Sequence, residues 1–456
     1  MTTVTSTPNA PATASPTITD LFPWLRIPTS DSGPAWLRSA RLASVEWATA
    51  RGFPTPKDED WKYTRLGPLL EVPFEPAPAE AGHRVSMATV DALTFDKEST
   101  RLVFVNGLFA PELSSLATLP QGATVTNLAS VLAEGGAGLE PFFSRPFDEY
   151  DHAFTAINTA CTEDGAFINI SAGTVVIRPI EVLFLSDVRG SPVVSNPRSL
   201  VLAGSGSQVT VVETYAGTTG DTTFTNTVTQ VLLDEGAQVK HYKIQDEPDT
   251  AFHLALLDVR QGRDSRFSSG SVALGSKIAR NEIHVRLQGE GAKASIDGLY
   301  LPRGDQHHDH PILIEHAAPR CTSHQLYKGI VDERAHGVFN GRIIVWPGAP
   351  GTDASQTNKN LLLSDRAEID TRPRLEIFTD DVKCTHGAAV GALDEEALFY
   401  LRSRGIPHEA AKALLTYAFA GEMLDLIGAG PLRTQVEMLV AGQLSTNGIG
   451  TMDALQ

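Results

Sequence analysis

The sequence predicts a mainly β protein whose core is a right-handed β-helix, or β-solenoid, with helical domains before and after it. From about residue 167, apolar and polar residues alternate with a period of two in short runs rich in β-branched residues. A turn-like hexamer recurs between these runs, for the most part about 30 residues apart. Such a spacing is typical of a solenoid, in which each coil buries its apolar face only against its neighbours.

The strands expected from this pattern are short and separated by turns. They are Phe167–Ile170, Thr174–Ile177, Val182–Leu185, Gln208–Val212, Val239–Ile244 and Ile283–Leu287. The hexamers comprise four close copies and two looser ones: Gly204–Val209, Asp234–Val239, Gly262–Phe267 and Gly289–Ala294, then Asp332–Gly337 and Ser364–Ile369. A β-sandwich is the structural alternative, but it does not explain the recurring hexamer.

The region before the strands is expected to be helical. Pro34 suits a first helical position, and apolar residues follow it at roughly helical spacing up to Ala48. We therefore expect four segments: a disordered tail over residues 1–16, an N-terminal helical domain with a linker over 17–150, the β-helix core over 151–385, and a C-terminal helical domain over 386–456.

The C-terminal region returns to a helical pattern. Asp394 can cap a short helix that ends near Arg404, and Pro407 opens a longer one. A third helix is expected over about Leu432–Leu444. The apolar stripe of the longer helix consists of Ala411, Leu414, Leu415, Ala418, Phe419 and Leu424.

Composition excludes several classes of function. The chain has 54 acidic and 37 basic residues, a net charge of −17, which argues against DNA or RNA as the main partner. The sequence contains no run of about 18 apolar residues, so we expect no membrane span. The first sixteen residues lack the features of a signal or transit peptide. We therefore expect a cytoplasmic protein.

The three cysteines are far apart in the sequence. Cys161, Cys321 and Cys384 form no CxxC pair, which argues against a disulfide framework and favours a reducing compartment. Three thiols also cannot supply the four thiolates of a self-contained iron–sulfur cluster. Any such cluster would need ligands from a partner.

The segment Phe378–Gly391 contains the most informative pair of residues, Cys384 and His386. In a strand, residues two apart point to the same face, with a rise of about 6.6 Å between them. That distance suits two contacts to one multi-atom cluster better than chelation of a single ion. Charged residues surround the pair, and we expect the nearby Lys383 to favour the thiolate form of Cys384.

The same segment resembles the Lys-Cys-Ser-His-Gly-Ala-Thr-Val-Gly run of the SufB/SufD iron–sulfur cluster assembly scaffolds. Thr385 and Ala389 are mild departures from that run. The acidic segment Asp58–Thr64, with its Trp-Lys-Tyr sequence, is more similar to SufD than to SufB, although it could also be only an aromatic packing anchor. Further similar motifs are Arg280–Gly289, Gly298–Leu301, Tyr327–Ile330, Phe339–Gly341, Asp353–Asn358, Asn360–Asp365, Pro373–Ile377 and Phe399–Gly405.

This resemblance implies a non-enzymatic scaffold subunit of the SufD type. It implies a heterodimer with a SufB-like paralogue, two copies of a SufC-like ATPase docked through the helices after Pro407, and a transient iron–sulfur cluster at the heterodimer interface. His386, with Cys384 beside it, would bind that cluster. The sequence contains no Walker-type loop, so we expect no ATP site. A flavin is possible but not indicated, and the isolated chain could form a homodimer.

Two alternatives remain open within the same fold class. The chain could be a SufB-type paralogue, or a β-solenoid interaction platform that binds partners without holding a cluster. Cys384 could equally be a small buried residue, and His386 a hydrogen-bonded residue at a domain junction. Cys161 is expected to be structural.

A second group of potential ligands lies in Gln306–His310, with His316, Cys321 and His324 downstream. These spacings match no zinc pattern. We therefore expect a solvated turn here rather than a metal site.

The most distant alternative is a carbohydrate-active enzyme, because β-helices often carry paired catalytic carboxylates. Glu282, Asp297 and Asp309 are candidates for such a pair. Aromatic residues make up only 7% of the chain, which is few for a sugar-binding cleft.

Overall fold

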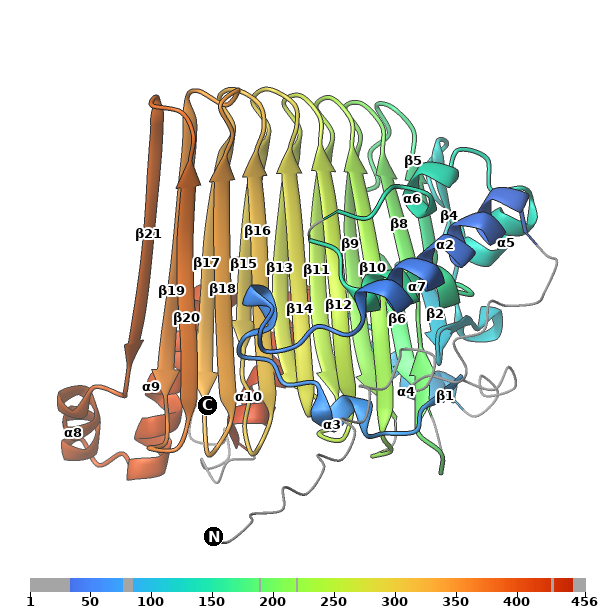
Figure 1. Cartoon of the computed structure of the whole chain (residues 1–456). Helices are drawn as coiled ribbons and strands as arrows, with labels where there is room; N and C mark the ends of the chain where they lie inside the picture. The colour runs from blue at the N-terminus through green and yellow to red at the C-terminus, as the bar shows by residue number, and fades with distance from the viewer. Residues whose placement is uncertain are drawn as a thin grey trace, which may run out of the picture.

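The chain, described here from a computed structural model, forms a two-sheet β-solenoid with helices near both ends of the sequence (Figure 1). The structure describes residues 33–76, 85–148, 150–187, 190–218, 220–427 and 430–445. The expected tail over residues 1–16 lies outside these ranges. The prediction of a mainly β fold built on a β-helix is confirmed.

Successive strands of the core alternate between two sheets, so that two strands make one coil. Sheet A runs in the order β20-β18-β16-β14-β12-β10-β8-β5-β4, and sheet B in the order β21-β19-β17-β15-β13-β11-β9-β6-β2-β3. From β5 and β6 onward, neighbouring strands of this order are parallel and pair in register one coil apart. The bounds are β5 Ala166–Ile170, β6 Ile180–Ser186, β7 Val193–Ser195, β8 Arg198–Ala203, β9 Gln208–Gly217, β10 Thr223–Leu233, β11 Gln238–Glu247, β12 Phe252–Gln261, β13 Arg266–Gly275, β14 Ile278–Leu287, β15 Lys293–Tyr300, β16 His307–His316, β17 Thr322–Val331, β18 His336–Val345, β19 Thr352–Leu362, β20 Glu368–Ile377 and β21 Val382–Gly391.

The four close hexamers form the turns that lead from sheet A to sheet B. One residue of each such turn has a left-handed backbone, which glycine adopts at little cost. Its N–H donates to a carbonyl in the equivalent turn of the next coil, for example from Gly206 to Glu235 and from Gly236 to Arg263, both at 2.8 Å. The left-handed residues are Gly206, Gly236, Asp264, Gly291, Arg320 and Gly351. The recurring turn therefore stacks into a hydrogen-bonded ladder along the solenoid.

The two looser hexamers are at the other end of the strands. Asp332–Gly337 spans the turn from β17 to β18, and Ser364–Ile369 spans the turn from β19 to β20. Both turns lead from sheet B to sheet A, so these copies are offset by part of a coil. This offset explains why the spacing departs from 30 residues at that point. The expected strand Thr174–Ile177 is also wrong: Val175 makes only an isolated bridge, and Ile177 is 90% exposed.

The N-terminal region differs from the expected helical domain because it also extends both sheets. β2 (Thr100–Val105) pairs in parallel with β6, and β4 (Ala123–Asn127) pairs antiparallel with β5. Every residue of β2 is buried, so this apolar segment is stabilised as a core strand. Short elements complete the region: β1 Glu75–Pro76, β3 Leu108–Phe109, η1 Glu59–Trp61, η3 Pro111–Leu113, α3 Gly67–Leu70, α4 Met87–Leu93, α5 Leu128–Ala133 and α6 Glu140–Phe143.

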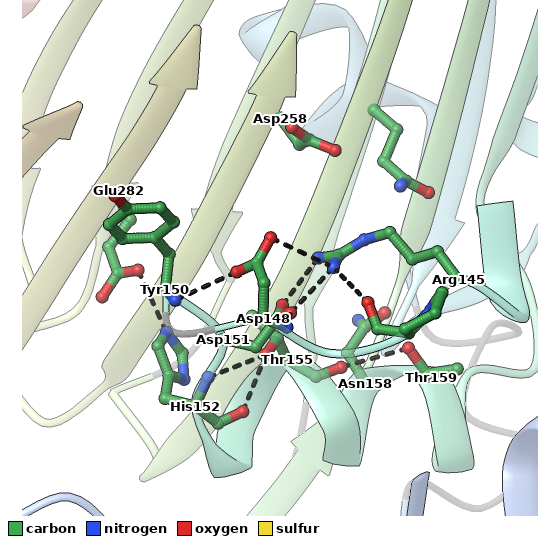
Figure 2. Close-up of polar contacts among 12 residues, drawn as sticks. Arg145, Asp148, Tyr150, Asp151, His152, Thr155, Asn158, Thr159, Asp258 and Glu282 are labelled. Carbon is green, nitrogen blue, oxygen red and sulfur yellow. Dashed lines mark hydrogen bonds and ion pairs between the residues drawn. The ribbon is translucent and has the colours of Figure 1, made fainter. Parts of the chain in front are cut away.

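Two N-terminal helices, α2 (Ala35–Arg51) and α7 (Ala153–Cys161), lie across the outer face of sheet A (Figure 1). The ring of Phe154 in α7 packs between Trp61 and Phe224 of β10, at centroid distances of 5.9 and 6.0 Å. His152, the N-cap residue of α7, forms a hydrogen bond between its Nε2 and Oε2 of Glu282 in β14 at 3.0 Å (Figure 2). Apolar packing and polar contacts together fix this region on the sheet.

The C-terminal helices occur where the sequence predicts them. They are α8 (Glu395–Ser403), capped by the Asp394 side chain, α9 (His408–Leu424) and α10 (Pro431–Ser445). α9 and α10 pack on the outer face of sheet B in one apolar cluster with residues such as Leu299 and Leu326. The expected boundary at residue 385 falls inside β21, because that strand continues to Gly391.

Candidate functional site

The solenoid ends in two strands that have a neighbour on one side only. β20 pairs with β18, and β21 pairs with β19. Their other edges present backbone N–H and C=O groups that a further strand could pair with. Every residue of β20 and β21 is partly or fully exposed, whereas β18 of the preceding coil is largely buried. This end of the solenoid is open (Figure 1).

Cys384 and His386 both lie on β21. Cys384 is half-buried and packs against the interior apolar cluster together with Val382. Because side chains alternate along a strand, His386 is on the same face as these two residues. The imidazole is exposed. The pair therefore lies on the inner face of the last coil, where the interior of the solenoid meets solvent.

The charged surroundings of Cys384 differ from the sequence prediction. Lys383 alternates to the opposite face of β21, so its ammonium group is directed away from the thiol. Burial raises the pKa of Cys384, and the nearby carboxylate of Asp353 raises it further. The prediction that Lys383 promotes the thiolate is therefore wrong: in the isolated chain the thiol form is favoured.

The strand beside this pair contributes one residue that the sequence reasoning did not select. Gln356 of β19 pairs in register with His386, and Ala354 pairs with Cys384. The Gln356 side chain is buried, with 1% of its surface exposed. The signal was available in the sequence, because Gln356 precedes His386 by one coil and is an inward-facing polar residue in a strand pattern.

The segment Gln306–His310 is a buried strand and not the expected solvated turn. It enters β16, where His308 and His310 face the interior, and burial lowers the pKa of His308 to about 4. His316 is hydrogen-bonded to Ser323 at 2.8 Å. In the described part of the chain, no cluster of three or more His, Cys, Asp or Glu residues could hold a metal ion.

Cys321 and His324, the other two candidate ligands, do not lie with the buried histidines of β16. Cys321 is buried in the turn before β17, where its thiol contacts the carbonyl of Gly289 at 3.3 Å. His324 is exposed on the outer side of β17, with Nδ1 2.8 Å from the hydroxyl of Ser355.

The carboxylates considered for a glycosidase do not face one another across a cleft. Glu282 and Asp309 are both buried and both paired with Arg280 on the outer face of sheet A. Asp297 belongs to β15 in sheet B, where its carboxylate accepts hydrogen bonds from Ser295 and from the backbone of Leu326. These groups therefore have structural partners.

Two further residues have the structural surroundings expected from the sequence. Trp61 is 4% exposed and stacks under the guanidinium of Arg280 at 3.8 Å, as an aromatic anchor should. Cys161 ends α7, and burial raises its pKa to about 12. A thiol with so high a pKa is unreactive at neutral pH.

Comparison with known proteins decides the family. Residues 184–419 match the SufBD core domain of the SUF system for FeS cluster assembly, and residues 15–182 match the SufBD protein N-terminal region. The chain belongs to the SufBD family. The predicted resemblance is therefore confirmed.

Relatives in the SufBD family match nearly the whole chain. An iron–sulfur cluster assembly SufBD family protein of Synechocystis is 36% identical over 89% of this chain and 90% of the relative. The iron–sulfur cluster assembly protein SufD of Escherichia coli is 33% identical over 84% of this chain and 88% of the relative. The iron–sulfur cluster assembly protein SufD of Bacillus subtilis is 26% identical over 89% of this chain and 94% of the relative.

Membership of this family makes the chain a component of iron–sulfur cluster assembly in the SUF system. Within the ranges that the structure describes, none of the helices combines the length and the apolar character that a membrane crossing requires.

Proposed function

We propose that this chain is a SufD-type scaffold subunit on which iron–sulfur clusters are assembled, and that it has no enzymatic activity of its own. The observation that carries the proposal is the open end of the solenoid, where Cys384 and His386 lie on the same face of an edge strand that is paired on one side only. The names of the SufD relatives support the same function.

The cluster is the cargo of this site. A neutral imidazole from His386 would bind iron less tightly than a thiolate does, which suits a cluster that must later be handed on. Cys384 would act as a second ligand or as a temporary acceptor of sulfur. Because its pKa is raised in the isolated chain, the thiol needs iron or a cationic group from a partner to lose its proton.

The open edges favour a second β-solenoid as the partner. A strand added to β20 or β21 would satisfy their free backbone groups, which is a common mode of recognition. We propose that a SufB-like paralogue supplies this strand together with the remaining cluster ligands. In its absence, a second copy of this chain could occupy the same edges.

A SufC-like ATPase would dock on the C-terminal helices. α8 extends beyond the last coil and exposes two large aromatic side chains, Phe399 at 72% and Tyr400 at 57%. Leu414 of α9 is also partly exposed. We propose that this helical surface receives the ATPase and that the assembled complex works in the cytoplasm.

Co-expression with a SufB-like and a SufC-like protein under anaerobic conditions tests the proposal. We expect the three chains to copurify, and His386→Ala to leave the complex intact while lowering the iron and sulfide it contains. His324→Ala is a matched control, because that histidine is also exposed on sheet B but faces outward. A complex that assembles with unchanged cluster content in His386→Ala would instead support an interaction platform without cluster binding.

A further inference from the structure

We propose that Gln356 is the positioning residue for His386: its side-chain carbonyl oxygen accepts a hydrogen bond from one ring N–H of the imidazole. This inference deepens the proposed function and rests on the role of His386 in it. The residue itself would not touch the cluster.

The amide of Gln356 is fixed on its nitrogen side. Its Nε2 donates to Oε1 of Gln325, one coil earlier, at 2.7 Å. Gly341 on the facing sheet leaves the space that this amide fills, because a Cβ at position 341 would collide with the Gln356 amide. Close packing on both sides leaves this amide little room to move.

The oxygen side of the same amide has no partner in the described part of the chain. Gln356 Oε1 is fully buried and accepts no hydrogen bond. Because nitrogen and oxygen diverge from one carbon, an amide whose nitrogen is turned toward β17 has its oxygen turned away from that strand. The next residue in the same register row on that side is His386 of β21. A buried carbonyl without a donor is costly, so a nearby N–H donor is favoured.

The hydrogen bond would have a direct chemical consequence for the imidazole. A neutral imidazole has one N–H and one lone pair, and the partner of the N–H decides which nitrogen carries it. With the N–H held by Gln356, the lone pair of the other nitrogen is presented at the open end. A metal-binding histidine commonly has a carbonyl in this supporting position.

Nitrogen-15 NMR of the full chain with labelled histidine tests the inference without any metal. The His386 signals are identified by their loss in His386→Ala, and all spectra are recorded at the same pH near 8. We expect a single tautomer in the native chain and a mixture of both in Gln356→Leu and Gln356→Met. Gln356→Glu retains an acceptor and should restore the single tautomer.

Asn358→Leu is the matched control, because Asn358 is an equally buried amide on β19 that faces Ala388 instead of His386. It should leave the tautomer unchanged. A mixture of tautomers in the native chain, or a single one in both apolar variants at position 356, would overturn the inference.

A separate measurement links this hydrogen bond to cluster assembly. In the co-expressed complex, Gln356→Leu should weaken iron binding by roughly 10- to 100-fold, as the loss of such supporting contacts does elsewhere. If the tautomer changes as expected but His386→Ala leaves the cluster content normal, Gln356 still positions the imidazole, and only the ligand role of His386 fails.

Discussion

Replacing Arg280 by methionine should destabilise the protein more than the loss of any exposed arginine. Arg280 is 2% exposed, and its guanidinium donates to Glu282 at 2.5 Å, to Asp309 and to the backbone oxygen of Asp60 at 2.9 Å. It also covers the ring of Trp61. One cation therefore pairs with two buried carboxylates of sheet A and holds the N-terminal segment on them.

The expected magnitude follows from what the substitution leaves behind. Methionine retains much of the volume but removes the charge, so Asp309 loses its cation and Glu282 keeps only its contact with His152. Breaking a buried ion pair by removing one partner costs about 3–5 kcal/mol. We expect a loss of that size in the free energy of unfolding near pH 7.5.

The stability loss caused by Arg280→Met should also depend on pH, which gives a second test. Burial alone would raise the pKa of Glu282, but Arg280 and His152 outweigh it and hold that pKa well below its usual range. In the native chain this carboxylate therefore stabilises the fold above its unfolded pKa, about 4.3. Burial raises the pKa of Asp309 in the native chain, although Arg280 is beside it. Loss of Arg280 removes a cation that lowers the pKa of both carboxyl groups, so both pKa values rise and the deficit should shrink as the pH falls.

Urea unfolding followed by circular dichroism at several pH values measures both effects. The triple variant Arg280→Met, Glu282→Gln, Asp309→Asn should regain most of the lost stability, because neither carboxylate of this cluster remains. Arg334→Met removes an exposed pair with Asp305 and should change little. A loss below about 1 kcal/mol, or a deficit that grows as the pH falls, would contradict the reasoning.

Three further outcomes are expected. Gly298→Ala should cost about 1–3 kcal/mol in urea unfolding because its Cβ would collide with the buried ring of Tyr327, whereas Gly387→Ala meets open space and should be neutral; equal stabilities would disprove the steric account. Phe419→Asp should loosen α9 from sheet B at a cost of roughly 2 kcal/mol, since the ring packs in the apolar cluster on that sheet and lies 4.5 Å from the ammonium of Lys328. Limited proteolysis should then cut α9 faster, and ATPase binding should weaken. Unchanged cleavage would argue against this account. Burial raises the pKa of Cys384, so iodoacetamide should label this thiol slowly at neutral pH. Labelling should become faster only when the pH exceeds the ordinary pKa of a free thiol. Fast labelling at pH 7 would contradict this.

The fold could be predicted because the solenoid repeats its local chemistry. Each turn from sheet A to sheet B needs one left-handed residue, and that need leaves glycine at Gly206, Gly236, Gly291 and Gly351. Offset copies in the opposite turns could not be recognised, because turns of similar composition occur at both ends of a strand. The strand Thr100–Val105 was missed since a single buried run has no periodicity to distinguish it from helix.

The candidate site was predictable only in part. The motif around Cys384 and His386 indicates the residues, and alternation places both on one face. The sequence could not show that Asp353 lies close enough to the thiol to act on it, because that depends on how β19 pairs with β21. Burial of His308 and His310 was also hidden, because polar residues in a strand are usually taken as exposed.

The position of His386 on the final coil has a consequence for cooperativity. In a solenoid, stability is approximately the sum of each unit and its contacts with adjacent units. The coil formed by β20 and β21 has one such contact where inner coils have two. It should therefore open at a lower free energy than the inner coils, without unfolding of the rest. A partner that supplies the second contact would stabilise this coil and cover its open end. Binding of the partner and ordering of the site would then be a single event.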